Sequence, residues 1–76
     1  MSALPAFMTP ERWIVQAFSA RAVAEGGVIR RKVEDVERVV GRKRFLHEVQ
    51  RRGFHAIENA DQFIVLCNQD PLMILT

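Results

Sequence analysis

Four glycines divide the chain into segments that are each long enough for one helix or one strand. They stand at positions 26, 27, 41 and 53. Apolar side chains recur at helical spacing in residues 10–25, 33–40 and 42–52, and a glycine, a frequent helix terminator, follows each of these segments. Thr9 and Pro10 are typical of a helix cap and of the first helical position. We therefore predict three helices over these ranges.

The other apolar segments are shorter and are predicted to form strands. Residues 28–32 indicate a strand at an edge or on the surface, because the second half of this segment is basic. Residues 54–58 and 62–67 predict a hairpin, since turn-forming residues separate them. The second arm is continuously apolar from residue 63 to residue 67, as expected for a strand with neighbours on both edges or cover on both faces.

The length of 76 residues limits the fold to one small domain. Folding would bury about 7,900 Å². The apolar part of this area contributes about 110 kcal/mol. The lost conformational entropy, at ~1.5 kcal/mol for each of the 76 residues, nearly cancels this gain. We expect a flexible segment at residues 1–8 and a domain at residues 9–76 that is stabilised as a homodimer. The predicted α+β fold has three helices packed on a small antiparallel sheet with a C-terminal hairpin.

Composition argues against a membrane protein, a metalloprotein and an enzyme. The longest apolar run has five residues, whereas a membrane helix needs ~20, and the first residues lack the pattern of a signal peptide. The single cysteine, Cys67, suits a reducing cytoplasm, and no spacing predicts a zinc site or a cofactor. Cys67 with His47 or His55 could form a nucleophile and a base, but the apolar strand around Cys67 favours an inert core thiol. We therefore expect no catalytic residues.

The order helix, strand, helix, helix, strand, strand resembles the winged-helix variant of the helix-turn-helix fold. The local resemblance lies in Val-Glu-Asp-Val-Glu-Arg-Val-Val-Gly at residues 33–41, Arg-Lys-Arg-Phe-Leu-His-Glu-Val at residues 42–49 and Arg-Arg-Gly-Phe at residues 51–54. This resemblance implies that the second helix of the pair reads double-stranded DNA and that the hairpin is the wing. The chain also resembles short uncharacterised bacterial open reading frames, in residues 26–31, 33–38, 51–55 and 63–68. This resemblance implies no activity.

Positive charge is concentrated in the middle of the chain. Residues 30–52 contain nine basic and four acidic side chains, hence +5, whereas the remainder has two basic and five acidic ones, hence −3. We predict a DNA-binding face on the last helix, opposite an apolar stripe at positions 45, 46 and 49. The predicted DNA-binding residues are Arg42, Lys43, Arg44, His47 and Arg51.

The basic face has a structural alternative, which is a solvated surface with ion pairs such as Arg44–Glu48. Three features argue against DNA. The preceding helix carries three carboxylates that would repel phosphate, the tip of the hairpin is acidic, and no aromatic side chains are interleaved with the basic cluster.

The C-terminal apolar segment gives a second hypothesis. Leu72, Met73, Ile74 and Leu75 follow a turn signal at residues 68–71. The segment either adds a strand to its own sheet or pairs with a sheet edge of a protein partner or a second copy. The alternative function is therefore a protein–protein interaction module that uses the basic face or this segment.

Overall fold

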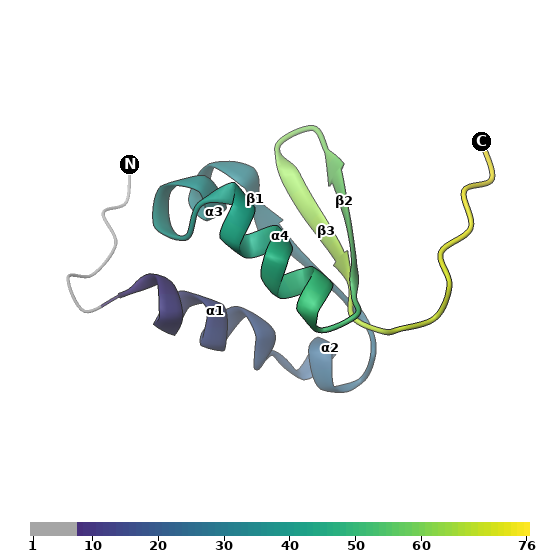
Figure 1. Cartoon of the computed structure of the whole chain (residues 1–76), viewed down its shortest axis with the longest axis horizontal. Helices are drawn as coiled ribbons and strands as arrows, with labels where there is room; N and C mark the ends of the chain where they lie inside the picture. The colour runs from purple at the N-terminus through teal and green to yellow at the C-terminus, as the bar shows by residue number, and fades with distance from the viewer. Residues whose placement is uncertain (1–7) are drawn as a thin grey trace.

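The structure is a computed structural model that describes residues 8–76. The flexible segment expected at residues 1–8 lies outside the described residues, apart from its last position. The described part is an α+β fold with helices and strands in the order α1 (Pro10–Phe18), α2 (Arg21–Ala24), β1 (Val28–Lys32), α3 (Val33–Val39), α4 (Arg42–Arg51), β2 (His55–Asn59) and β3 (Gln62–Leu66) (Figure 1). Six of these seven elements correspond to a segment predicted from the sequence, and α2 is the addition.

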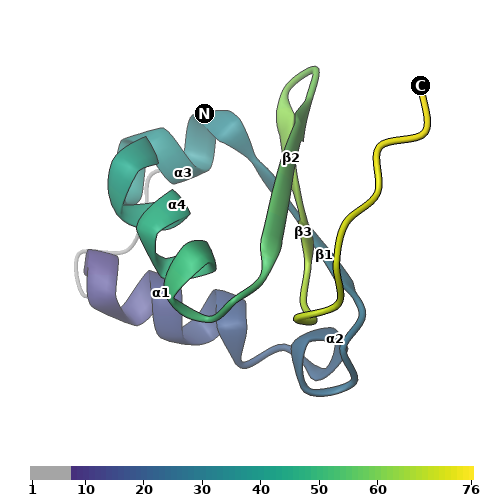
Figure 2. The same ribbon diagram turned by 45° about the vertical axis from the view of Figure 1, so that its right-hand side comes forward.

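The sheet has the strand order β1-β3-β2, and both neighbouring pairs are antiparallel. Of the two alternatives that the sequence left open for the most apolar strand, β3 has neighbours on both edges. Figure 2 shows α1, α3 and α4 on one side of the sheet and the C-terminal segment on the other. The helices thus cover a single face of the sheet, and β2 leaves one backbone edge unpaired within the described residues.

The core lies between the helices and the covered face of the sheet. Along β3 and the residue after it, Phe63, Val65 and Cys67 are buried, while the residues between them point to the other face and stay half-exposed. Phe45 of α4 is completely buried, with its ring centroid 5.2 Å from that of Phe63. The rings of Trp13 and Phe18 on α1 both lie 6.1 Å from Phe45. This aromatic cluster fixes which side of α4 faces the protein.

The helix predicted over residues 10–25 is interrupted, and this part of the prediction is wrong. The hydroxyl and the backbone N–H of Ser19 both donate to the carbonyl oxygen of Gln16, at 3.1 and 3.3 Å, and α1 ends there. Serine competes with helical hydrogen bonding in this way. Ala20 is extended, with φ −60° and ψ 149°, so α2 starts in a new direction. The break brings α2 against β1 instead of continuing α1 past the sheet.

The last apolar segment forms no strand in the structure. The Asp70 N–H donates to the side-chain oxygen of Asn68 at 3.0 Å, and the His55 ring lies 2.7 Å from the Asp70 carbonyl oxygen. Pro71 follows and has no N–H for a sheet hydrogen bond. Residues 71–76 therefore leave the sheet after this turn, and an added intramolecular strand is not formed.

The turn between α3 and α4 depends on a glycine. Gly41 has φ 91° and ψ 142°, a conformation that is close to a region populated almost only by glycine. Only Val40 and Gly41 separate the two helices. The tight connection holds α3 and α4 as a pair, with the hairpin following directly after α4.

Candidate nucleic-acid interface

The orientation of α4 differs from the one that its apolar residues predict. Phe45 and Val49 are buried as expected, but Leu46 is 36 % exposed and lies on the flank that faces β2. The side chain of Glu48 is only 14 % exposed. The protein therefore covers α4 along positions 45, 48, 49 and 52, and the outward face is rotated away from the predicted one.

The outward face of α4 carries four polar side chains in a row, which we call the α4 polar row. Its members are Lys43, His47, Gln50 and Arg51, all exposed. Their spacing of four, three and one residues places them on one side of a helix. Three of them were predicted as DNA-binding residues. Gln50 was not predicted. Its spacing from residues 43 and 47 places it on the same side of the helix, but that side could be identified as the outward one only once the buried side was known.

Arg42 is directed toward the hairpin rather than into this row. Its guanidinium pairs with Glu58 at the end of β2 and lies 3.4 Å from a carboxylate oxygen of Glu37 on α3. It also lies 5.1 Å from the centre of the Phe63 ring. The hydrogen bond from Arg42 lowers the pKa of Glu58, and the same bond raises the pKa of Arg42. Arg42 thus connects α3, α4 and the hairpin.

Arg44 lies on the side of α4 that faces α1. Its guanidinium is 3.3 Å from the carboxylate of Glu11, and both side chains are about half-exposed. The Arg44–Glu48 pair considered from the sequence is not formed. An exposed pair of this kind contributes about 0–1 kcal/mol, so the Arg44 side chain can exchange Glu11 for another anion at little cost.

Glu48 is held by two arginines at the C-terminal end of α4. Arg51 and Arg52 each donate to its carboxylate at 2.6 Å. The hydrogen bond from Arg51 is the largest cause that lowers the pKa of Glu48 below its ordinary value. Arg52 also lies 4.6 Å from the centre of the Phe18 ring, so it connects α4 to α1. Arg51 is the outer member of this pair and its side chain remains mostly exposed.

The basic segment at residues 30–52 does not form one continuous surface. Arg30 and Lys32 alternate with buried Ile29 along β1, so they point to the sheet face that the helices leave open. Arg31 lies beside α1, and Arg38 pairs with Glu34 on α3. The net charge of the segment is therefore divided among several faces, and α4 alone provides a compact basic group.

Cys67, His47 and His55, the residues considered for catalysis, have different surroundings in the structure. The thiol of Cys67 is buried, contacts the Val65 carbonyl oxygen at 3.7 Å and has its pKa raised by burial. The hydrogen-bond partner of the His55 ring is the backbone of Asp70, and His47 belongs to the α4 polar row. Over residues 8–76, no group of three His, Cys, Asp or Glu side chains is placed to hold a metal ion.

In the part of the chain that the structure describes, no helix has both the length and the apolar character needed to cross a bilayer. Comparison of the chain with protein-family models, with curated proteins and with solved structures finds no match.

Proposed function

We propose that the chain is a winged-helix-like domain that binds double-stranded DNA through α4. The α3–α4 pair followed by a hairpin, with β1 paired to β3, has the element order of that variant of the helix-turn-helix fold. In helix-turn-helix proteins the second helix of the pair lies in the major groove. In this chain α4 holds that position in the order of elements.

The observation that carries the proposal is the composition of the α4 polar row. Its four exposed side chains include two cations and no carboxylate. Lysine and arginine bind phosphates or the acceptor edge of guanine, and glutamine can pair with adenine. Arg44 lies beside the row, and its exposed pair with Glu11 can be replaced by a phosphate contact. Lys43, Arg44 and Arg51 thus supply three cations for one duplex.

Contacts within the protein reduce the repulsion that α3 would exert on DNA. Glu34 pairs with Arg38, and Glu37 lies within 3.4 Å of Arg42, so two of the three carboxylates of α3 have a cationic partner. The hairpin tip carries the exposed carboxylates of Glu58 and Asp61 and no cation of its own, although Glu58 pairs with Arg42. We therefore propose recognition by α4 alone, with a hairpin that does not contact phosphate.

The experiment compares two double variants that remove the same charge. Lys43→Ala with Arg51→Ala removes both cations of the α4 polar row, while Arg52 still binds Glu48. Arg12→Ala with Arg21→Ala removes two exposed arginines from α1 and α2. Binding to a mixed-sequence duplex of ~20 bp would be followed by fluorescence anisotropy at ~50 mM salt.

We expect the α4 variant to bind at least about tenfold more weakly, because it loses charge-assisted contacts to phosphates or bases. The α1–α2 variant should bind within about twofold of the unaltered protein, since its arginines lie off the proposed surface. Equal weakening of both variants would show that only net charge matters and would contradict the proposal. Circular dichroism would verify that both variants are folded.

A cytoplasmic location belongs to this proposal, because DNA and reduced thiols are both found there. The second candidate function is a protein–protein interaction module. It is favoured by one specific observation, which is the exposure of four consecutive apolar side chains at residues 72–75.

A further inference from the structure

We propose that two copies of this chain exchange their C-terminal ends. Residues 72–76, which comprise the C-terminal apolar segment and Thr76, insert into a cleft of the second copy that lies between its β2 and its own residues 72–76. The exchange is reciprocal, so each copy contributes one segment and one cleft. This proposal does not require DNA binding. The cleft lies beside the free edge of β2, and the C-terminal segment that borders it runs on the side of the sheet opposite the helices (Figure 2).

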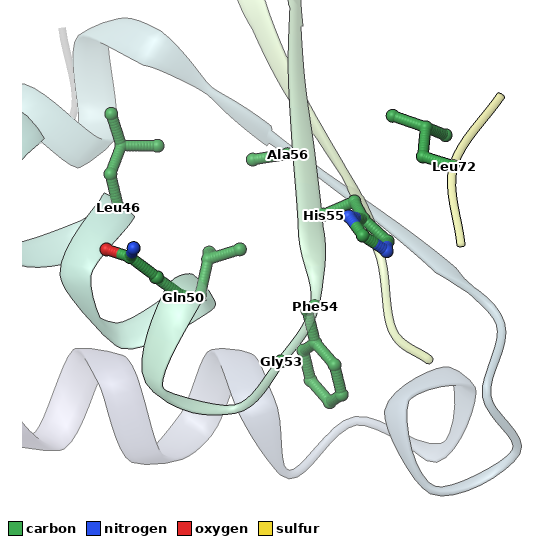
Figure 3. A pocket seen from close by; sticks show the side chains of 8 residues that line it. Leu46, Gln50, Gly53, Phe54, His55, Ala56 and Leu72 are labelled. Carbon is green, nitrogen blue, oxygen red and sulfur yellow. The ribbon is translucent and has the colours of Figure 1, made fainter. Parts of the chain in front are cut away.

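The cleft lies beside the unpaired edge of β2. Its volume is about 620 Å³, and it is lined by Ala56 and Ile57 on β2 and by residues 72–76 on the other side. A second hollow, of about 460 Å³, lies between β2 and α4 and shares Ala56 and Leu72 with the cleft, and Leu46 also lines it. Figure 3 shows Leu46 and Gln50 on one side of β2 and His55 and Leu72 on the other. The apolar lining therefore follows both sides of one strand.

The segment has the side chains that such a cleft needs. Leu72, Met73, Ile74 and Leu75 are 46, 78, 82 and 83 % exposed. Contiguous exposed apolar surface of this kind marks an interaction site in soluble proteins. An extended segment that joins a free strand edge also satisfies the backbone groups of that edge. One chain thus carries both halves of the interaction, which is what a two-fold symmetric pair requires.

Charge and area favour a second copy as the occupant. None of the side chains that line the cleft is ionisable, so the side chains of two identical surfaces can approach each other without charge repulsion. An unfolded chain exposes about 1.45 Å² per dalton, so a segment of five such residues can bury at most roughly 800 Å². A standard protein interface buries about 800 Å² on each partner. Exchange of the two segments therefore accounts for an interface of ordinary size.

The path of the chain explains why the segment does not fill its own cleft. Asn68 and His55 hold the Asp70 backbone in a turn, and Pro71 cannot donate a hydrogen bond to β2. The segment consequently leaves the turn with the cleft between itself and β2. A segment from another molecule carries no such restriction on its approach.

The first test is sedimentation velocity of the full chain without DNA, from about 5 to 200 µM. We expect a concentration-dependent monomer–dimer equilibrium. Ile74→Asp should weaken self-association at least tenfold, because a carboxylate would be buried in the cleft. Val15→Asp is the matched control, since Val15 is 64 % exposed on α1 and does not line the cleft. A protein that stays monomeric up to 200 µM, or equal effects of the two variants, would overturn the proposal.

The second test separates exchange between chains from docking within one chain. Ile57→Cys and Ile74→Cys variants would be mixed and oxidised, with the unaltered protein as the control for buried Cys67. We expect a disulfide-linked dimer in the mixture at a higher yield than in either variant alone. In the double variant, at a concentration at which sedimentation shows the dimer, a disulfide confined to the monomer would contradict the exchange.

Discussion

Replacing Phe45 by alanine should destabilise the protein much more than replacing the adjacent Leu46. Phe45 is completely buried against three aromatic rings, and Phe→Ala changes in cores cost about 3–5 kcal/mol. Leu46 is 36 % exposed at the mouth of a groove, so removing its side chain costs about 1–2 kcal/mol and leaves no closed cavity. A domain of this size has a total stability of about 4–11 kcal/mol. Phe45→Ala therefore removes a large part of this stability.

Urea unfolding followed by circular dichroism measures both changes. With a slope of about 1 kcal/mol/M, Leu46→Ala should lower the midpoint by about 1–2 M. Phe45→Ala should lower it by at least about 3 M or abolish the cooperative transition altogether. Equal losses, or a larger loss for Leu46→Ala, would refute the orientation of α4 on which the proposed DNA surface depends.

Two further changes test local features of the fold. Gly41→Ala should cost about 1–3 kcal/mol although a Cβ at this position meets nothing within 4 Å, because the φ of 91° disfavours any residue with a side chain; an unchanged urea midpoint would contradict this reason. The pKa of Glu48 is lowered in the folded state, so its ion pairs stabilise the protein above the ordinary value of 4.5, and this contribution is lost as the pH falls through the folded pKa. Glu48→Gln should therefore lower the midpoint at pH 7 and reduce its fall between pH 7 and pH 3, and an unreduced fall would show that Glu48 contributes little to acid unfolding.

Much of the fold was predictable because glycines and the spacing of apolar residues determine helices and strands through short-range effects. The helices at 33–40 and 42–52 were predicted to within one residue of their observed ends, and the apolar run at 63–67 indicated the central strand. The break after Phe18 was not predicted, since it depends on the Ser19 hydroxyl rather than on hydropathy. The absence of a last strand depends in part on the contact of the Asp70 carbonyl oxygen with the ring of His55, which is distant in sequence.

The candidate site was harder to predict than the fold, because a helix face is defined by what packs against it. Leu46 is apolar but exposed, and Glu48 is charged but mostly covered, so hydropathy predicts the wrong burial for both residues. Glu48 is covered because Arg51 and Arg52 neutralise it, and Leu46 is exposed because it faces the groove beside β2. Arg42 was predicted to contact DNA because of its charge. In the structure it forms ion pairs with Glu37 of α3 and Glu58 of β2, which the sequence around Arg42 does not indicate.

The salt dependence of duplex binding tests the proposed role of α4 most directly. Three phosphate contacts, from Lys43, Arg44 and Arg51, predict a slope of about −2.7 in a plot of log affinity against log salt. Affinity should therefore fall about fortyfold between ~50 and ~200 mM salt. Removing Lys43 and Arg51 should reduce the slope to about −0.9, whereas removing Arg12 and Arg21 should leave it unchanged. No binding at ~50 mM salt, or a slope that does not respond to the α4 variant, would contradict a DNA-binding surface on this helix.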